Sequence, residues 1–244
     1  MSGFIDSLSA AWKRNDSLVC VGLDPEVERI GSVSRIFDFN KAIIDATADL
    51  VCCYKPQFAH YAAHGAEDQL LRTIQYIHGE YPGVPVLLDS KRGDVGNTAE
   101  RYAREAFERY GADAVTVNPY LGTDSLEPFL KYADRGVVIL CRTSNPGARD
   151  LQDLEVSGRK LYHVVAEMAA KRWNSRGNCM LVVGATYPRE LKEVRRGRIS
   201  EYADRYKKAS FHPGKRPWGV PCDLAFPCAT QNELSLEHAK SLVG

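Results

Sequence analysis

The stretch LLDSKRGDVGNT, residues 87–98, is the part of the sequence that indicates the fold most clearly. It runs from a short apolar segment, through alternating charges, into a stretch of helical period, as a βα unit of a parallel sheet does. The same succession recurs along the chain and predicts an α/β protein. The predicted strands cover residues 18–24, 51–58, 84–89, 114–117, 137–141 and 180–185.

Polar and ionisable residues gather where these predicted strands end. In a (β/α)8 barrel the active site is built at the C-terminal ends of the strands, so this placement favours a TIM-type barrel enzyme. A doubly wound sheet stays open as the alternative fold, because it also binds ligands at that edge. The residues at the strand ends are Asp24, Lys55, Asp89, Lys91, Asn118 and Arg142 to Asn145.

The composition restricts the class of partner. The chain has 244 residues, with 32 basic and 31 acidic side chains and a formal net charge of +1. Such a balance provides no overall field to hold nucleic acid, so a small-molecule substrate is expected. No apolar run approaches the roughly 20 residues that span a bilayer, and we expect no membrane partner.

The cysteines and histidines favour neither a disulfide scaffold nor a metal site. The seven cysteines are an odd number and several lie within apolar runs, which is typical of reduced thiols in a cytoplasmic protein. No C-x-x-C pair exists. His60 and His64 have the i, i+4 spacing of a zinc helix but lack the glutamate of H-E-x-x-H, so a packed or solvated pair is the better interpretation.

The D-x-K-x-x-D spacing of Asp89, Lys91 and Asp94 places a cation between two carboxylates. Adjacent carboxylates favour a protonated lysine while burial opposes it. A protonated lysine that faces a developing carbanion is both its electrostatic stabiliser and its proton donor. The alternative interpretation is an exposed charged loop followed by Asn97 or Thr98 as a helix N-cap.

Five segments of the chain resemble, in order and spacing, orotidine 5′-phosphate decarboxylases of the subgroup common in bacteria. The resemblance extends to about residue 196 and implies a (β/α)8 barrel that converts orotidine 5′-phosphate to uridine 5′-phosphate (UMP) in pyrimidine synthesis. The segments are VGLDPE (21–26), YKPQFAHYAAHG (54–65), LLDSKRGDVGNTAERYA (87–103), ADAVTVNPYLGTDSLEPF (112–129) and RTSNPGA (142–148).

The resemblance also implies a catalytic network and no metal, flavin or nucleotide cofactor. Lys91 would protonate C6 of the pyrimidine as CO₂ leaves, and Asp89 would lie beside the substrate carboxylate. Lys55 would bridge Asp89 and the ribose. Asp94 completes the charged network and would reach into the active site of a partner subunit.

Four further residues are implied to bind the substrate. Asp24 would bind the ribose hydroxyls, and Ser144 would meet the edge of the pyrimidine. Val95 and Thr98, with Asp94, would reach across the interface of a homodimer whose two subunits share their sites.

The resemblance changes at the join between Arg196 and Gly197. Residues 197–206, GRISEYADRY, and 216–242, which include PCATQNEL, are similar to part of the coenzyme domain of a hexameric-type glutamate dehydrogenase. We therefore divide the chain into a decarboxylase-like barrel of six βα units, residues 1–196, and a foreign-looking tail, residues 197–244.

The division leaves the barrel incomplete after its sixth strand. The family's glycine-rich phosphate-binding turn, P-G-x-G-x-Q-G-G, and its phosphate-binding arginine are not found in the tail. A catalytically dead remnant without the phosphate grip is thus an alternative to an active decarboxylase. An NADP-dependent glutamate dehydrogenase is a remote one, because no G-x-G-x-x-G follows a strand upstream.

Overall fold

The computed structural model describes residues 3–184, which fall into two compact units. Among the described residues, the first unit comprises 3–140 and 167–181, and the second comprises 141–166 and 182–184. The proposed tail, residues 197–244, lies outside the described residues. The prediction that the tail lacks the phosphate-binding turn and arginine therefore concerns residues that the structure does not describe. Within residues 3–184, no helix is both long and apolar enough to cross a membrane.

The strands of the two parallel sheets follow one another in chain order. A two-stranded sheet pairs β1 with β2 in parallel, and a second sheet has the order β3-β4-β5-β8. Two isolated parallel bridges, Tyr54 to Val86 and Gln57 to Asp89, connect β2 with β3. The bounds are β1 (Cys20–Leu23), β2 (Cys53–Pro56), β3 (Leu87–Arg92), β4 (Ala114–Val117), β5 (Gly136–Arg142) and β8 (Cys179–Val183).

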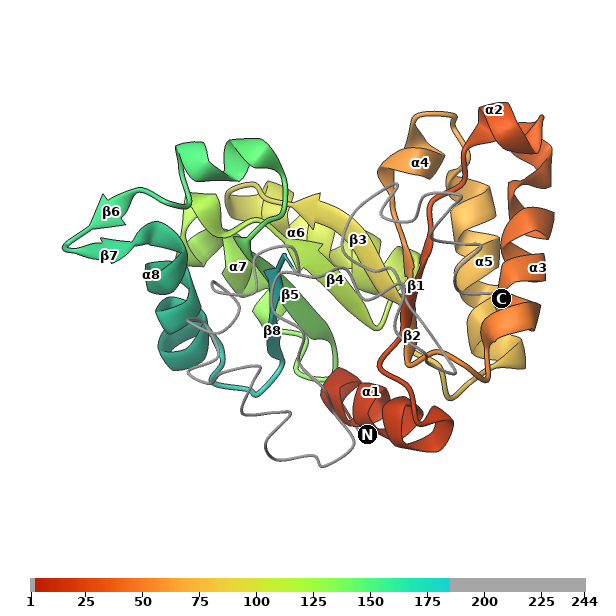
Figure 1. Cartoon of the computed structure of the whole chain (residues 1–244), viewed down its shortest axis with the longest axis horizontal. Coiled ribbons are helices and arrows are strands. Elements are labelled where there is room, and N and C mark those ends of the chain that lie inside the picture. The colour runs from red at the N-terminus through yellow and green to blue at the C-terminus, as the bar shows by residue number, and fades with distance from the viewer. Residues whose placement is uncertain (1–2, 185–244) are drawn as a thin grey trace, which may run out of the picture. The chain divides into compact units, whose positions relative to one another are not determined.

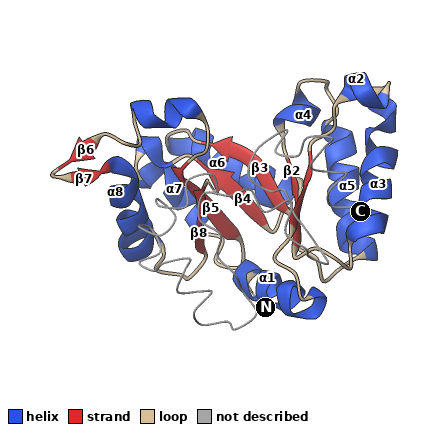
Figure 2. Cartoon of the chain, viewed as in Figure 1, coloured by secondary structure: helices blue, strands red, loops and turns tan. Residues whose placement is uncertain are grey.

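Helices separate successive strands, as βα units require (Figures 1 and 2). Figure 1 shows α3 and α5 packed side by side. The helices of the first unit are α1 (Phe4–Asn15), α2 (Val27–Ile30), η1 (Val33–Arg35), α3 (Ile36–Thr47), α4 (Ala59–Ala62), α5 (Glu67–Glu80), α6 (Gly96–Arg104), η2 (Glu105–Arg109), η3 (Pro119–Leu121), α7 (Thr123–Leu130) and η5 (Ala169–Trp173). Helix α8 (Leu161–Met168) begins in the second unit.

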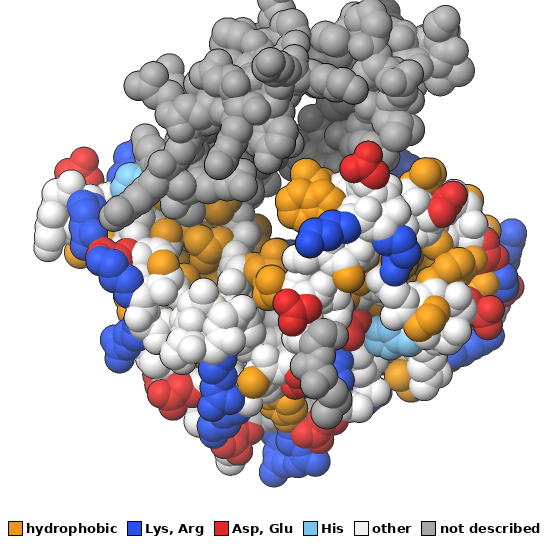
Figure 3. Space-filling view, turned by 90° about the horizontal axis from the view of Figure 1, so that it is seen from below, with side chains coloured by type: hydrophobic (Ala, Val, Ile, Leu, Met, Phe, Trp, Pro, Cys, Tyr) orange, Lys and Arg blue, Asp and Glu red, His pale blue; other side chains and the backbone are white. Residues whose placement is uncertain are grey.

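The core forms where helix stripes meet the sheet. All four residues of β4 are buried, as in a parallel strand that is covered on both faces. Helix α5 buries Leu70, Ile74 and Ile77 at spacings of four and three residues, which is the apolar stripe of an amphipathic helix. On the face shown in Figure 3, acidic and basic side chains are interspersed.

The second unit contains an element that the sequence analysis did not predict. Strands β6 (Glu155–Val156) and β7 (Arg159–Lys160) form an antiparallel hairpin. Its two-residue turn has positive φ at both Ser157 (53°) and Gly158 (74°), the conformation that closes tight hairpins. The helix η4 (Pro146–Asp150) precedes the hairpin.

The six predicted strands are all present, with one shift in bounds that affects the site. The third was predicted to end at Asp89, whereas β3 continues to Arg92. The pairing of β3 with β4 shifts register between Leu88 and Arg92, after which Arg92 pairs with Val117. Asp89 and Lys91 therefore lie two residues apart on the strand itself.

Candidate active site

Asp89 is the centre of a network in which two lysines and two neutral donors meet one carboxylate. Lys91 Nζ and Thr116 Oγ1 donate to its Oδ1 at 2.8 and 2.7 Å. Gln57 Nε2 and Lys55 Nζ donate to its Oδ2 at 3.1 and 3.3 Å. Asp89 is 6% exposed, so these bonds replace the water that a surface carboxylate would keep.

Three adjacent strands bring these residues together at one end of the sheet. Lys55 lies on β2 and Gln57 follows it, and the Gln57–Asp89 bridge aligns this end of β2 with β3. Thr116 lies on β4, next to β3. Side chains two residues apart on a strand share a face, which explains why Lys55 and Gln57 both reach Asp89.

The charges of the network stabilise one another. Burial raises the pKa of Asp89, but the hydrogen bond from Lys91, the charge of Lys55 and the Thr116 hydroxyl together hold it below its usual value. Burial lowers the pKa of Lys55, but the charges of Asp89 and Asp24 outweigh burial and raise it above its usual value. Asp89 is thus ionised and Lys55 protonated across the neutral range.

Lys91 adopts a backbone conformation that is rare for a residue with a side chain. Its φ is 47°, in the left-handed region, and such conformations cost on the order of 1–3 kcal/mol. Its N–H donates to Thr116 Oγ1 at 2.9 Å. This unusual backbone conformation lies at the register shift of β3, and the Lys91 ammonium group contacts Asp89. The candidate proton donor is therefore also the strained residue of the strand.

The backbone after Lys91 packs tightly against the end of β4. The N–H of Asn118 donates to the carbonyl of Arg92 at 2.7 Å. A Cβ on Gly93 would lie 3.2 Å from both the Cβ and the carbonyl oxygen of Asn118. Only glycine therefore fits this position without a displacement of its neighbour.

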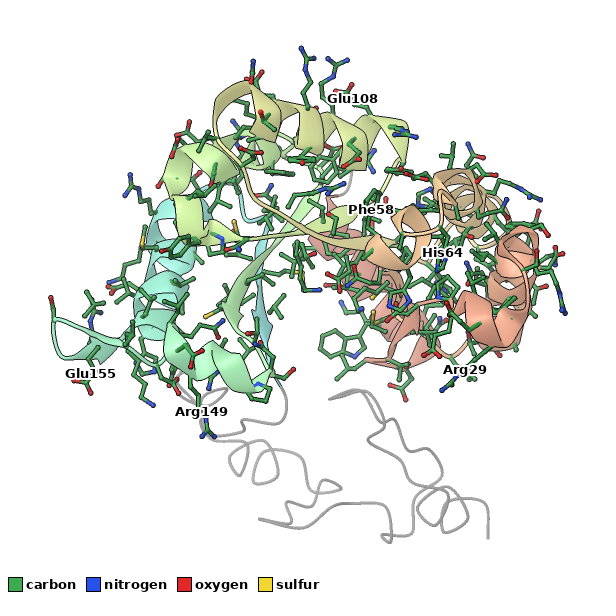
Figure 4. The ribbon with its side chains drawn as sticks, turned by 90° about the horizontal axis from the view of Figure 1, so that it is seen from above. Arg29, Phe58, His64, Glu108, Arg149 and Glu155 are labelled. Atoms are coloured by element: carbon green, nitrogen blue, oxygen red, sulfur yellow. The ribbon has the colours of Figure 1, made fainter. Side chains whose placement is uncertain are left out.

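Arg92 contacts two aromatic rings and a carboxylate. Its guanidinium carbon lies 4.4 Å from the ring centroids of both Phe58 and Tyr102. Its Nε and Nη2 both donate to Glu105 Oε2. Figure 4 shows Phe58 between the segment that carries His64 and the helix that carries Glu108.

Asp94 does not join the Asp89 network within one chain. In the described part of the chain its carboxylate accepts from the N–H of Val95 at 2.7 Å and makes no ion pair with Lys91. Val95 is 53% exposed and Thr98 is also exposed. The N-cap of α6 is Val95, so the alternative interpretation of Asn97 or Thr98 as the cap is wrong.

Asp24 follows β1 and is exposed, and its negative charge helps to raise the pKa of Lys55. It also lines a cavity of about 630 Å³ together with Glu26, Arg29, Ile30, Arg35, Asp38, Phe39 and Ala42. Ser144 lies in the second unit, after β5, where a Cβ on Gly184 would come 3.0 Å from the Ser144 Cβ. Its relation to the Asp89 network stays a prediction.

His60 and His64 lie in and just after a short helix. His60 Nδ1 lies 3.2 Å from the carbonyl oxygen of Pro25, and His64 lies in the turn that follows the helix of His60. Among residues 3–184, no group of three or more His, Cys, Asp and Glu side chains is placed to hold a metal ion.

Sequence reasoning missed Gln57 and Thr116, although each carries a signal. Gln57 lies two residues after Lys55, on the same face of a strand. Thr116 is a hydroxyl within the otherwise apolar and buried run AVTV. The Arg92–Glu105 pair joins two elements, and nothing in its spacing of 13 residues indicates it.

Comparison with known proteins supplies two family matches. Residues 17–209 match the model of the orotidine 5′-phosphate decarboxylase / HUMPS family. Residues 183–244 match the model of the glutamate/leucine/phenylalanine/valine dehydrogenases. The two matches overlap at residues 183–209.

Individual relatives agree with the first match. The orotidine 5′-phosphate decarboxylase of Cupriavidus necator is 58% identical over 197 residues, which cover 79% of this chain and 72% of the relative. That of Azoarcus sp. is 59% identical over 197 residues, 79% of this chain and 73% of the relative. Among solved structures, the OMP decarboxylase of Leishmania donovani superimposes with a TM-score of 0.74 at 43% identity, over 80% of this chain and 76% of that one.

Proposed function

The chain belongs to the orotidine 5′-phosphate decarboxylase / HUMPS family, and we propose that the network around Asp89 is the site at which it decarboxylates orotidine 5′-phosphate to UMP. The enzyme is a carboxy-lyase of pyrimidine synthesis with the TIM-barrel fold, and it uses no cofactor. The observation that carries the site assignment is one buried carboxylate held between two lysine ammonium groups.

Lys91 is the residue that stabilises and protonates C6, the reacting carbon. When the bond between C6 and the carboxylate breaks, CO₂ leaves and the electron pair stays on C6. The ammonium of Lys91 stabilises this charge and then transfers its proton to C6, which gives UMP and a neutral lysine. The Lys91 side chain is 44% exposed, so the lysine regains its proton from solvent.

The other residues of the site position Lys91 and bind the substrate. Asp89 lies beside the substrate carboxylate and holds the Lys91 ammonium 2.8 Å away. Lys55 connects Asp89 to the ribose, and Asp24 binds the ribose hydroxyls. The negative charge of Asp24 helps to raise the pKa of Lys55, which supports their closeness. Ser144 meets the pyrimidine edge.

The active enzyme is a homodimer whose subunits share their sites. In its own chain the Asp94 carboxylate accepts a hydrogen bond from the N–H of Val95. Val95 and Thr98 are exposed beside it. These three residues are therefore free to enter the site of a second copy. We also propose that the enzyme works in the cytoplasm.

The two alternative functions have less support. The family match covers residues 17–209, which include the Asp89 network, and this favours an active decarboxylase over a dead remnant. The dehydrogenase match is confined to residues 183–244. The division at Arg196 and Gly197 stays a proposal, since the decarboxylase match continues to residue 209.

The Lys91→Ala variant tests the assignment. We expect it to abolish CO₂ release from orotidine 5′-phosphate while thermal unfolding changes little, because this exposed lysine acts on the transition state. Lys171→Ala is the control, since Lys171 forms an exposed ion pair with Glu167 on a helix. Retention of most of kcat in Lys91→Ala would refute the role of Lys91.

A further inference from the structure

Thr116 is the one neutral side chain that contacts both Asp89 and the backbone of Lys91 among the hydrogen bonds described above. Its hydroxyl lies 2.7 Å from Asp89 Oδ1 and 2.9 Å from the backbone nitrogen of Lys91. The same Asp89 oxygen accepts from Lys91 Nζ. The hydroxyl therefore closes a small ring of contacts around the candidate proton donor.

The direction of each hydrogen bond in this ring is fixed. A backbone N–H can only donate, so the Thr116 oxygen accepts from Lys91 and its single proton goes to the ionised carboxylate. Thr116 is 2% exposed, which leaves no access for water to replace the hydroxyl. Its neighbours on β4 are Ala114, Val115 and Val117, all buried and apolar. A hydroxyl at this one position is thus not explained by packing.

The backbone contact reaches the strained part of β3. Lys91 has a φ of 47° at the point where the pairing of β3 with β4 shifts register. Through its bond to the Lys91 N–H, Thr116 holds the peptide that sets the direction of the Lys91 side chain. Through its bond to Asp89, it holds the carboxylate to which that side chain points.

We infer that Thr116 is a positioning residue, which holds the Asp89 carboxylate and the Lys91 backbone in the arrangement that decarboxylation uses. The inference rests on the proposed function for its catalytic part. Its structural part is independent of activity, because the two hydrogen bonds are properties of the free chain.

The electrostatic readout is the titration of Asp89. The charged groups that face this carboxylate are Lys55 on β2 and Lys91 on β3, with Gln57 and Thr116 as neutral donors. The Thr116 hydrogen bond is one cause of the lowered pKa of Asp89. Its loss should raise that pKa while both lysines remain.

The experiment follows the Asp89 carboxyl by NMR in the full chain with 13C-labelled aspartate, with the signal identified by its loss in Asp89→Asn. Thr116→Val keeps the shape and removes the hydroxyl, and Thr116→Ser restores the hydroxyl. Thr73→Val is the matched control. The Thr73 hydroxyl is also buried, donates to the Gln69 carbonyl at 2.8 Å and accepts from Asn40 at 3.1 Å, away from the network.

We expect the pKa of Asp89 to rise in Thr116→Val and to return toward the wild-type value in Thr116→Ser, with no change in Thr73→Val. Steady-state decarboxylation should show kcat lower by about 10- to 100-fold in Thr116→Val with KM little changed, and recovery in Thr116→Ser. If Thr116→Val does not fold, Thr116→Ala takes its place, since it also removes the hydroxyl.

An Asp89 titration unchanged by loss of the hydroxyl would overturn the inference. So would an active wild-type chain whose kcat is the same in Thr116→Val. A wild-type chain without decarboxylase activity would instead contradict the proposed function, and the titration would still decide the structural role of Thr116.

Discussion

The guanidinium group of Arg92 and the carboxylate of Glu105 form a partly buried ion pair, with Nε and Nη2 at 3.1 and 2.8 Å from one oxygen. Both side chains are 21% exposed. The rings of Phe58 and Tyr102 both contact the guanidinium. These four residues, which we call the Arg92 clamp, connect the segment after β2, the end of β3 and the α6–η2 helix. The clamp thus adjoins both lysine-bearing strands of the site.

Replacement of Arg92 by lysine should lower both activity and stability. A lysine keeps the charge but loses the paired donors and the flat surface that stacks on aromatic rings. We expect kcat to fall about 10-fold, because small displacements of catalytic groups are costly. The free energy of unfolding should fall by about 1–3 kcal/mol. Urea unfolding and steady-state kinetics measure the two effects.

Arg104→Lys is the control for this variant. Arg104 pairs with Glu108 on the same helical segment, but both side chains are at least half exposed. Such surface pairs contribute about 0–1 kcal/mol, so the control should differ little from wild type. Equal effects of the two substitutions would show that Arg92 has no special role beside the site.

Gly93→Ala should destabilise the loop that follows Lys91. Its Cβ would approach Asn118 to 3.2 Å at two atoms, one of them a backbone oxygen. Overpacking of this kind typically costs about 1–3 kcal/mol, and here either the loop after Lys91 or the backbone of Asn118 must move. We expect a lower melting temperature and a lower kcat.

Gly79→Ala is the matched control for Gly93→Ala. Gly79 lies within α5, and a Cβ there would meet nothing within 4 Å. Alanine should stabilise the helix by about 0.5–1 kcal/mol. If Gly93→Ala proved as harmless as Gly79→Ala, the close approach to Asn118 would not constrain the loop.

The fold was more predictable from the sequence than the details of the site. Apolar runs and helical stretches depend on local pattern, so all six strands were found. The D-x-K-x-x-D spacing and the family resemblance identified Lys55, Asp89 and Lys91, and the structure brings these three together.

The partners of that network depend on register between strands, which a single sequence does not display. Thr116 reaches Asp89 only because β4 lies beside β3 and the pairing shifts near Lys91. Gln57 reaches it through an isolated bridge between β2 and β3. The positive φ of Lys91 was equally hidden, because lysine has no preference for that conformation.

Stability should depend on acid through Asp89. Burial opposes ionisation of this carboxyl, but Lys91, Lys55 and Thr116 lower its folded pKa below the usual value of about 3.9. A group with a depressed folded pKa stabilises the fold above its unfolded pKa, and this contribution is lost as pH falls through the folded value. The free energy of unfolding should therefore fall on acidification below about pH 4.

Asp89→Asn should flatten this acid dependence, since asparagine does not titrate. The pKa shift of Lys55 has the opposite sign and acts at high pH. Protonated Lys55 stabilises the fold below its unfolded pKa of about 10.4, and this contribution is lost as pH rises through its folded pKa. Urea unfolding from pH 2.5 to 7 would measure the acid limb. An equal slope in wild type and Asp89→Asn would mean that Asp89 is not a stabilising anion.

Mixed dimers should test the shared site. Lys91→Ala and Asp94→Ala chains should each be nearly inactive alone, because each lacks one member of the charged network. In a mixed dimer, one of the two sites would receive an intact Lys91 from one subunit and an intact Asp94 from the other. We expect up to a quarter of wild-type activity per chain when equal amounts are mixed at random: half of the dimers are mixed, and each has one intact site of two.

Absence of recovery, in a sample where mixed dimers are demonstrated by two different affinity tags, would place Asp94 in the site of its own chain. The Lys91→Ala and Asp94→Ala homodimers, assayed separately, give the background.

Replacement of the tail should improve both binding and stability. Residues 197–244 lack the glycine-rich turn and the arginine that the family resemblance assigns to the substrate phosphate. Each charge-assisted hydrogen bond to a phosphate contributes about 1.5–3 kcal/mol, and this remote binding energy can assemble a closed site for chemistry at C6. We therefore expect a chain in which the corresponding segment of the Cupriavidus necator relative replaces residues 197–244 to have a higher kcat/KM and melting temperature. A second chimera joined after residue 209, where the decarboxylase match ends, tests the position of the boundary. The Lys91→Ala substitution in each chimera controls for chemistry that arises elsewhere. If the original chain turned over orotidine 5′-phosphate as efficiently as both chimeras, its own tail would supply the phosphate contacts, and residues 197–244 would belong to the working enzyme.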